Sequence, residues 1–186
     1  MSIHYNKGNA TNKIAFILSA PGKIEGETGR PASGKTGDNL NAILEILNKK
    51  KPLIFESIDR YQYVITNTTN EVIHSSKESG RTEDSNTNIT EKNNIVRIQS
   101  EIENCSIIIL CGKKAELLTE YLYDKILVKS PHPGNKGLRN KYKNNSTFLK
   151  GIEKPADREA ARLRFCAECI LEQLHNVNRT FQLDTN

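Results

Sequence analysis

Four short apolar runs are spread along the chain, and each has the composition of a buried β-strand. They are rich in β-branched and aromatic residues, and their length is that of a strand rather than a helix. The four runs span residues 14–20, 61–66, 106–111 and 125–129. Short apolar strands of this kind are typical of a parallel sheet that is covered on both faces.

Segments with helical periodicity alternate with these runs. They cover residues 38–49, 91–104 and 113–123, and Pro155 starts a long pattern that predicts a closing helix. The alternation predicts an α/β fold, namely a three-layer α/β/α sandwich around a central four-stranded parallel sheet. Ligands of such folds bind beyond the carboxyl ends of the strands, so the residues that follow each strand are the candidates for chemistry.

The chain has 186 residues, which is a usual size for one compact domain. We therefore expect a single domain over residues 1–186. Residues 75–94 are crowded with Ser, Thr, Asn, Glu and Lys, which predicts a long polar loop. Residues 1–12 and 177–186 are expected to be flexible tails.

Bulk composition restricts the partners of the protein only broadly. The formal net charge of +5 favours an anionic partner without identifying it. No apolar run approaches the roughly 18 residues of a membrane span, and the N-terminal segment lacks the apolar core of a secretion signal. We therefore expect a cytoplasmic monomer with no membrane partner.

The segment from Gly29 to Thr36 fits the phosphate-loop pattern G-x-x-x-x-G-K-[ST], which predicts a nucleotide hydrolase. That function requires the loop to leave a strand directly, so that backbone N–H groups and a helix N-terminus surround one phosphate. Here several residues separate Ala20, at the end of the first run, from Gly29, and no other strand ends in the Asp that would hold a magnesium ion. The nucleotide hydrolase is kept as an alternative.

Residues 19–40, taken as one unit, resemble the first motif region of the thermophile-type uracil-DNA glycosylases of bacteria and archaea. That region reads A-P-G, six residues, then G-R-P-F-x-G-x-[AS]-G-x-x-L, and the spacing in this chain is the same. Three later segments resemble the family's other motifs, in order and each after a predicted strand: Ile65-Thr-Asn67, Leu110-Cys-Gly112 and His132-Pro133. The resemblance implies a DNA glycosylase, an enzyme that extrudes a base from DNA and cleaves its N-glycosidic bond.

The resemblance assigns roles to three polar side chains. Glu25 would position the attacking water and stabilise the positively charged sugar, with Glu27 as the alternative acid. His132 would donate a hydrogen bond to the base as negative charge develops there. Asn67 would both donate to and accept from the Watson–Crick edge of the base.

The resemblance also implies that Ser19, Ala20 and Gly22 line the base site with backbone N–H groups. Ala32 stands where the family has a phenylalanine that stacks on uracil, a contact worth roughly 1–3 kcal/mol. Two interpretations follow. A bulky hypermodified pyrimidine, of the kind found in phage DNA, fills the space and points to a role in phage defence, or another aromatic residue stacks on ordinary uracil. The candidates for that residue are Tyr5, Tyr61, Tyr142 and Phe148.

A basic segment follows His132, since the chain has no acidic residue between Asp124 and Glu153. We expect DNA-phosphate contacts from this segment and from the first motif region, and either Leu138 or Arg139 would fill the gap left by the extruded base. The expected phosphate contacts are Arg30, Lys35, Lys136, Arg139, Lys141 and Lys143. A solvated charged face is the alternative interpretation.

The four cysteines do not reproduce the spacing of the iron–sulfur ligands of the resembled family. Those relatives have a cysteine pair ahead of the first strand, whereas the first cysteine here is Cys105. We therefore expect no metal and no cofactor, with Cys105, Cys111, Cys166 and Cys169 as free thiols. A nucleic-acid-binding module of the same fold without catalysis is a further alternative, because fold does not fix activity.

Overall fold

The computed structural model describes residues 4–76 and 80–183, and side chains as far as residue 176. Its centre is a four-stranded sheet in the order β2-β1-β3-β4, in which every neighbouring pair is parallel. The strands are β1 (Ile14–Leu18), β2 (Val64–Asn67), β3 (Ile107–Cys111) and β4 (Ile126–Ser130). Each lies within or overlaps one of the predicted runs, so the predicted sheet is confirmed.

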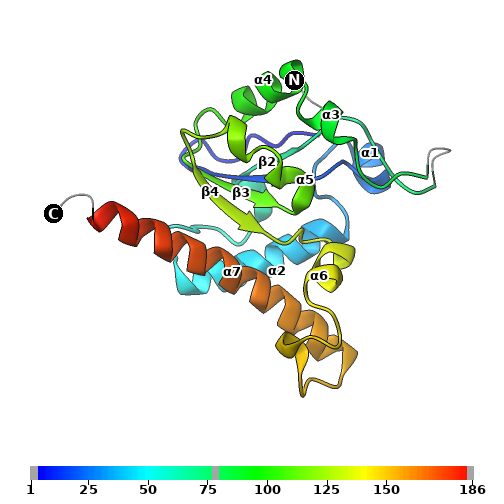
Figure 1. Ribbon diagram of the computed structural model, residues 1–186, viewed down its shortest axis with the longest axis vertical. Coiled ribbons are helices and arrows are strands. Elements are labelled where there is room, and N and C mark those ends of the chain that lie inside the picture. The colour runs from blue at the N-terminus through cyan, green and yellow to red at the C-terminus, as the bar shows by residue number, and fades with distance from the viewer. Residues whose placement is uncertain (1–3, 77–79, 184–186) are drawn as a thin grey trace.

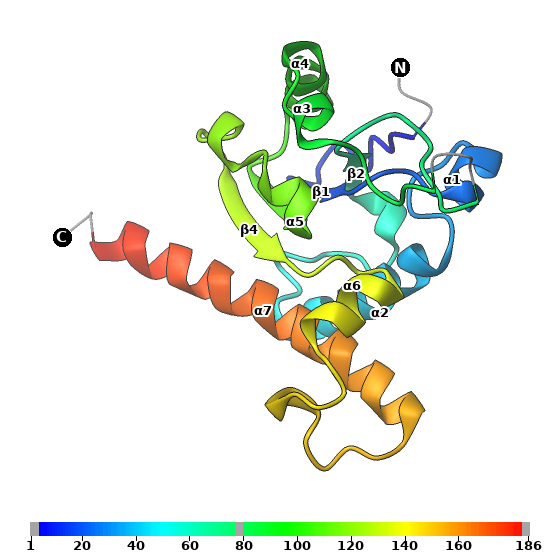
Figure 2. The same cartoon turned by 45° about the vertical axis from the view of Figure 1, so that its right-hand side comes forward.

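Helices cover both faces of this sheet (Figures 1 and 2). One face packs against α2 (Lys35–Lys50) and α7 (Pro155–Leu183), which also contact each other. The other face carries α3 (Asn86–Ile89), α4 (Lys92–Glu101) and α5 (Lys113–Glu116). The predicted three-layer α/β/α sandwich is therefore confirmed.

The side chains of β1 show why the sheet needs two covering layers. Phe16 and Leu18 belong to the core cluster shared with α2 and α7, whereas Ala15 and Ile17 belong to the cluster beneath α4 and α5. All five residues of β1 are buried. Successive residues of a strand point to opposite faces, so a run that is apolar throughout is stable only when both faces are covered.

Two short helices lie at the carboxyl end of the sheet and were not predicted. Helix α1 (Lys23–Thr28) follows β1, and α6 (Asn135–Lys141) follows β4 in the basic segment after His132. Both begin after a glycine, Gly22 and Gly134, which provides no side-chain cap. Their starts therefore lack the Ser, Thr, Asp or Asn that marks a helix N-terminus in a sequence.

Other boundaries also differ from the predictions. The helix expected over residues 113–123 is only α5 followed by a 3₁₀ turn, Thr119–Tyr121, and the expected polar loop contains α3. Helix α7 continues to Leu183, so its last turns are not the tail that we expected, while residues 184–186 lie outside the described residues. Residues 4–12 are likewise not a free tail, because Asn6 pairs with Ile65 of β2.

Candidate functional site

The candidate site lies where the parallel strands end, because all four carboxyl ends meet at one edge of the sheet. Ser19, Thr68 and Gly112 follow β1, β2 and β3 directly, and His132 is the second residue after β4. The backbone carbonyl of Ser19 accepts hydrogen bonds from the N–H of Thr68 at 2.9 Å and from its hydroxyl at 3.1 Å. The first two loops are thus joined at the edge from which ligand-binding residues of this fold class project.

The hydrogen bonding of His132 fixes its tautomer. The N–H of Gly134 donates to Nδ1 of His132 at 3.0 Å, so Nδ1 is an acceptor and the ring proton lies on Nε2. Burial lowers the pKa of His132 from 6.5 to about 4, although the nearby Glu25 carboxylate acts in the opposite direction. At neutral pH His132 is therefore a neutral imidazole with one hydrogen-bond donor, Nε2–H.

Two glycines make room for His132. A Cβ atom on Gly137 of α6 would lie 2.5 Å from the backbone oxygen of His132 and 2.7 Å from its Cβ. A Cβ on Gly112 would lie 3.0 Å from the same Cβ, and the φ of Gly112, 89°, is in the region that favours glycine. The backbones of the segment after β3 and of α6 thus hold His132 from two sides.

Glu25 bridges the starts of two helices. Its Oε2 accepts from the N–H of Gly22 at 3.2 Å, and its Oε1 accepts from the N–H of Gly34 at 3.2 Å. These glycines are the N-caps of α1 and α2, where partial positive charge stabilises an anion. The N–H of Gly22 is therefore bound to Glu25, which corrects our expectation that it faces the base.

Glu27, the alternative acid, points elsewhere. It is exposed and lies 3.9 Å from the Nζ of Lys23 in a surface ion pair. Glu25, in contrast, is partly buried between the starts of α1 and α2, and its carboxylate acts to raise the pKa of His132 and of His4 against the larger effect of burial. The geometry favours Glu25 as the acidic group of the site.

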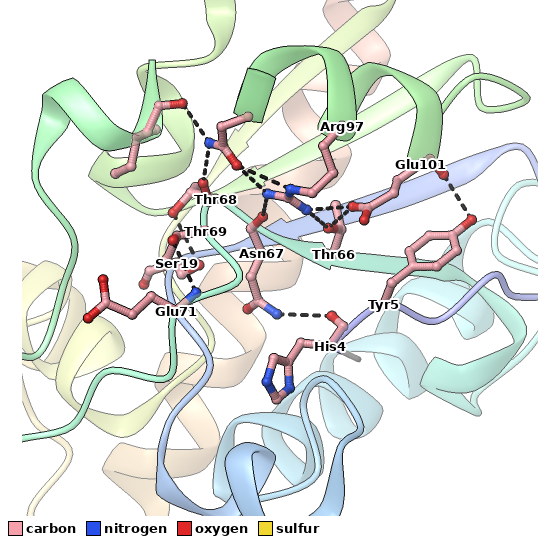
Figure 3. A network of polar contacts seen from close by, with 12 residues as sticks. His4, Tyr5, Ser19, Thr66, Asn67, Thr68, Thr69, Glu71, Arg97 and Glu101 are labelled. Atoms are coloured by element: carbon pink, nitrogen blue, oxygen red, sulfur yellow. Dashed lines mark hydrogen bonds and ion pairs between the residues drawn. The ribbon is translucent and has the colours of Figure 1, made fainter. Parts of the chain in front are cut away.

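Asn67 ends β2 and is held at both its backbone and its side chain (Figure 3). Its backbone oxygen accepts from the guanidinium of Arg97 at 2.9 Å, and its Nδ2 donates to the backbone oxygen of His4 at 3.2 Å. Arg97 also donates to Glu101 at 2.7 Å and to the hydroxyl of Thr66 at 3.2 Å. Arg97 and His4 were not predicted as site residues; the only sequence signal was the i,i+4 spacing of Arg97 and Glu101, which ordinarily marks a surface pair.

The position of Ala32 differs from the expectation. Ala32 is 1% exposed, belongs to the core cluster of α2 and has a positive φ of 51°. It therefore does not line an open space that a large base could enter, and the expectation that such a base fills the place of the missing phenylalanine is wrong.

The four aromatic residues that were candidates to replace this phenylalanine also lie elsewhere. The hydroxyl of Tyr5 donates to the backbone oxygen of Glu101 on the α4 side of the sheet. The ring of Tyr61 has the guanidinium of Arg30 over it, 3.9 Å from the ring centroid. Tyr142 and Phe148 pack edge to face at 5.1 Å. Each ring has a packing partner of its own.

A cavity of about 510 Å³ opens beside His132, between the ends of β3 and β4 and helices α5, α6 and α7. Polar side chains supply much of its wall: Ser19, Ser130, Asn140, Lys141, Cys169 and Gln173. Ala20, next to Ser19, is half-buried in the same loop. The volume is within the roughly 300–1,000 Å³ of small-molecule sites, so the cavity can hold a group larger than a single base.

The basic residues after His132 form the exposed side of α6 and the turn behind it. Lys136, Arg139, Lys141 and Lys143 are all exposed, and Arg139 pairs with Glu159 at 2.9 Å. Lys35, also exposed, starts α2 nearby. We name the exposed face made by Lys136, Arg139, Lys141 and Lys143 the α6 basic face.

Leu138 does not belong to the α6 basic face. It is 1% exposed and packs in the core with residues of α2 and α7. The expectation that Leu138 fills the gap left by an extruded base is therefore wrong, because helical periodicity turns it inward while its charged neighbours point outward.

The segment from Gly29 to Thr36 does not have phosphate-loop geometry. Helix α1 lies between β1 and Gly29, and Gly29 is the C-cap of that helix rather than the start of a loop from a strand. The N–H of Gly34 is already bound to the carboxylate of Glu25. An anionic side chain thus occupies the helix N-terminus that a phosphate would need.

The cysteines do not fit the iron–sulfur cluster of the resembled family. Cys105 lies in the core on the α4 side of the sheet, whereas Cys111 and Cys166 lie on the α7 side. None of the four cysteines is in a disulfide. Among the described residues, no group of three or more His, Cys, Asp or Glu side chains is placed to hold a metal ion.

The chain matches a known protein family over most of its length. Residues 5–155 match the family described as the Uracil DNA glycosylase superfamily, a range that contains all four motifs and the strands that carry them. No curated protein matches the chain significantly. Within the part of the chain that the structure describes, no helix is both long and apolar enough to cross a membrane. Because the matched range covers most of the 186 residues, the chain belongs to the uracil-DNA glycosylase superfamily.

Proposed function

We propose that this protein extrudes a pyrimidine nucleotide from DNA and hydrolyses its N-glycosidic bond, which leaves an abasic site and a free base. Membership in the superfamily supports a DNA glycosylase function in general. The single observation that carries the proposal is the neutral His132, whose proton is fixed on Nε2 by the N–H of Gly134. Such a donor stabilises the charge that develops on a departing base without first losing or gaining a proton.

His132 and Glu25 divide the two charges of this reaction. As the bond between C1′ and the base nitrogen breaks, negative charge grows on the base and positive charge on the sugar. Nε2–H of His132 donates to the base oxygen, and the carboxylate of Glu25 stabilises the sugar and orients the water whose oxygen bonds to C1′. The proton released by that water is taken up by the solvent or by the departing base.

The backbone contacts of Glu25 are compatible with this role. A carboxylate has about four acceptor positions, and the N–H groups of Gly22 and Gly34 use two of them. These bonds stabilise the ionised group at the starts of two helices while leaving acceptor positions for a water molecule.

For the substrate, we propose a pyrimidine that carries a bulky polar substituent. The support is the cavity beside His132, because its volume of about 510 Å³ and its hydroxyl, amide and ammonium groups suit a hydroxyl-rich substituent such as a hexose. Ala32 supplies none of this support. If the DNA of infecting phages is the source of such bases, the protein serves in phage defence; ordinary uracil is the competing substrate.

The test compares duplexes that contain uracil with duplexes that contain glucosylated hydroxymethylcytosine. Alkali-labile abasic sites are counted for the wild type, for Asn140→Trp, which fills the cavity, and for Asn145→Trp, an exposed control outside it. We expect only Asn140→Trp to lose activity on the duplex that contains glucosylated hydroxymethylcytosine. Preference of the wild type for uracil would refute the proposal of a bulky substrate. DNA binding without abasic sites on any duplex would refute the proposed glycosylase activity.

A further inference from the structure

Another cavity lies where the end of α6 and the turn after it meet the first turns of α7. Its volume is about 400 Å³, and Figures 1 and 2 show the segment between the two helices extending away from the sheet beside the start of α7. Of the described residues that line the cavity, four are cationic and one is anionic: Arg139, Lys143, Arg158, Arg162 and Glu159. This excess of positive charge favours an anionic ligand.

Arg162 forms the inner wall of this cavity. It is 2% exposed, and its guanidinium donates to the backbone oxygen of Tyr142 at 3.0 Å and to Oδ1 of Asn144 at 2.6 Å. These bonds fasten the turn after α6 to α7. The shape of the cavity is therefore set by hydrogen bonds between the two segments, and a buried positive charge lies at its base.

Glu159 does not balance the positive charge of the cavity. Its Oε1 accepts from Nη1 of Arg162 at 3.1 Å and from Nη2 of Arg139 at 2.9 Å. One carboxylate is thus shared by two guanidinium groups. The remaining positive charge lies in a partly enclosed place, where salt screens it less than on an open surface.

Arg158 and Lys143 are the two lining cations that are available to a ligand. Nε of Arg158 donates to the backbone oxygen of Ile152 at 2.6 Å, which holds this half-buried side chain in place. Neither the Nη atoms of Arg158 nor Nζ of Lys143 has a polar partner among the described residues. A fixed guanidinium with free N–H groups beside an ammonium group suits the oxygens of a phosphate.

We propose that this cavity, which we name the α7 phosphate site, binds one backbone phosphate of the DNA through Arg158 and Lys143. Helix α6 contacts His132 through Gly137 and reaches the cavity at its other end, so DNA that follows the α6 basic face from His132 arrives there. The proposal rests on the proposed function for DNA as the substrate. Arg158 lies outside residues 5–155, so this contact is not among those that the superfamily motifs supply.

The experiment measures the DNA affinity of Arg158→Ala, Lys143→Ala and the control Arg164→Ala. Arg164 is an exposed cation of the same helix that does not line the cavity and lies 3.8 Å from a carboxylate oxygen of Glu168. The duplex carries a tetrahydrofuran abasic analogue at the target position, so it cannot be cleaved and does not depend on which base is excised. Single methylphosphonates, which lack the charge of a phosphate, are then introduced one position at a time. Thermal unfolding midpoints verify that each variant is folded.

We expect Arg158→Ala and Lys143→Ala to bind the unmodified duplex about tenfold more weakly, the scale of losing hydrogen bonds to a charged group. At one position a methylphosphonate should weaken binding by the wild type and by Arg164→Ala about equally. It should weaken binding by the two cavity variants much less, because they have already lost that contact.

The absence of such a position, or an equal loss of affinity in Arg164→Ala, would overturn the proposal. If Arg158→Ala does not fold, the exposed Lys143→Ala decides the question. If no position behaves in this way but inorganic phosphate raises the unfolding midpoint of the wild type and not of Lys143→Ala, the cavity binds free phosphate and the proposal is wrong. Absence of base release by the wild type would overturn the proposed function instead, while these affinities still test the α7 phosphate site.

Discussion

At the scale of single residues, the chemistry depends on which of two neighbouring acids faces the site. Glu25→Gln removes the negative charge and turns one backbone contact into a clash of donors, because both Gly22 and Gly34 donate N–H groups to the carboxylate. We expect base release to slow by about 100-fold or more, the scale typical of losing one well-placed charge-stabilising group. Glu27→Gln is the matched control and should leave single-turnover rates unchanged. If Glu27→Gln slows base release and Glu25→Gln does not, Glu27 rather than Glu25 is the acid of the site.

The lowered pKa of His132 makes a prediction about stability. The pKa is about 4 in the folded protein and near 6.5 when unfolded, so unfolding takes up a proton between these values. The contribution of neutral His132 to the free energy of unfolding is fully present above pH 6.5 and is lost as the pH falls to about 4. Urea unfolding at pH 7 and at pH 5 should show that the free energy of unfolding falls less between these two pH values in His132→Asn than in the wild type. Equal losses would mean that His132 is not held neutral.

At the scale of elements, α6 packs against His132 through Gly137, and we expect this contact to position the imidazole. Gly137→Ala places a methyl group against the backbone of His132, so we expect kcat to fall on the order of 100-fold because the donor is misplaced. Leu138→Ala removes a buried side chain and should lower the free energy of unfolding by roughly 2–5 kcal/mol, while the folded fraction keeps its kcat. Chemical denaturation and single-turnover kinetics on both variants check this. A kcat lost in Leu138→Ala and kept in Gly137→Ala would restore the role first expected for Leu138.

The elements also show what the sequence could predict. Strands such as β1 were predictable because both faces are apolar, and the positions of Glu25, Asn67 and His132 followed from motifs at strand ends. Helices α1 and α6 were missed because glycines, not capping side chains, precede them.

The remaining site features depend on packing between distant segments. Ala32 and Leu138 point into the core for reasons of packing, and Arg97 reaches Asn67 only after α4 has docked on the sheet. No local pattern carries that information.

At the scale of the whole molecule, the net charge of +5 matters through its distribution. Lys136, Arg139, Lys141 and Lys143 are exposed on the α6 basic face, beside the site. Changing all four to Ala should weaken DNA binding and flatten its dependence on salt, by roughly 0.7–0.9 in slope for each DNA phosphate that is no longer neutralised. The change should be smaller than that expected for four phosphates, because Arg139 is already paired with Glu159.

The control for that measurement changes Lys49, Lys50 and Lys51 to Ala at the far end of α2. These lysines are equally exposed but lie at the opposite end of the helix from the site. Binding isotherms at several salt concentrations should show little change for them. An equal decrease in the salt dependence of DNA affinity in both variants would mean that DNA does not bind preferentially to the α6 basic face.

The most direct test of the central claim is base release from DNA in the presence of a chelator and without nucleotide. The free base is identified by mass spectrometry and abasic sites by alkaline cleavage, for the wild type and for His132→Ala. We predict stoichiometric base and abasic site from the wild type, with release slowed by roughly 100-fold or more and DNA binding retained in His132→Ala. Base release that requires ATP or magnesium, or that proceeds unchanged in His132→Ala, would contradict this mechanism.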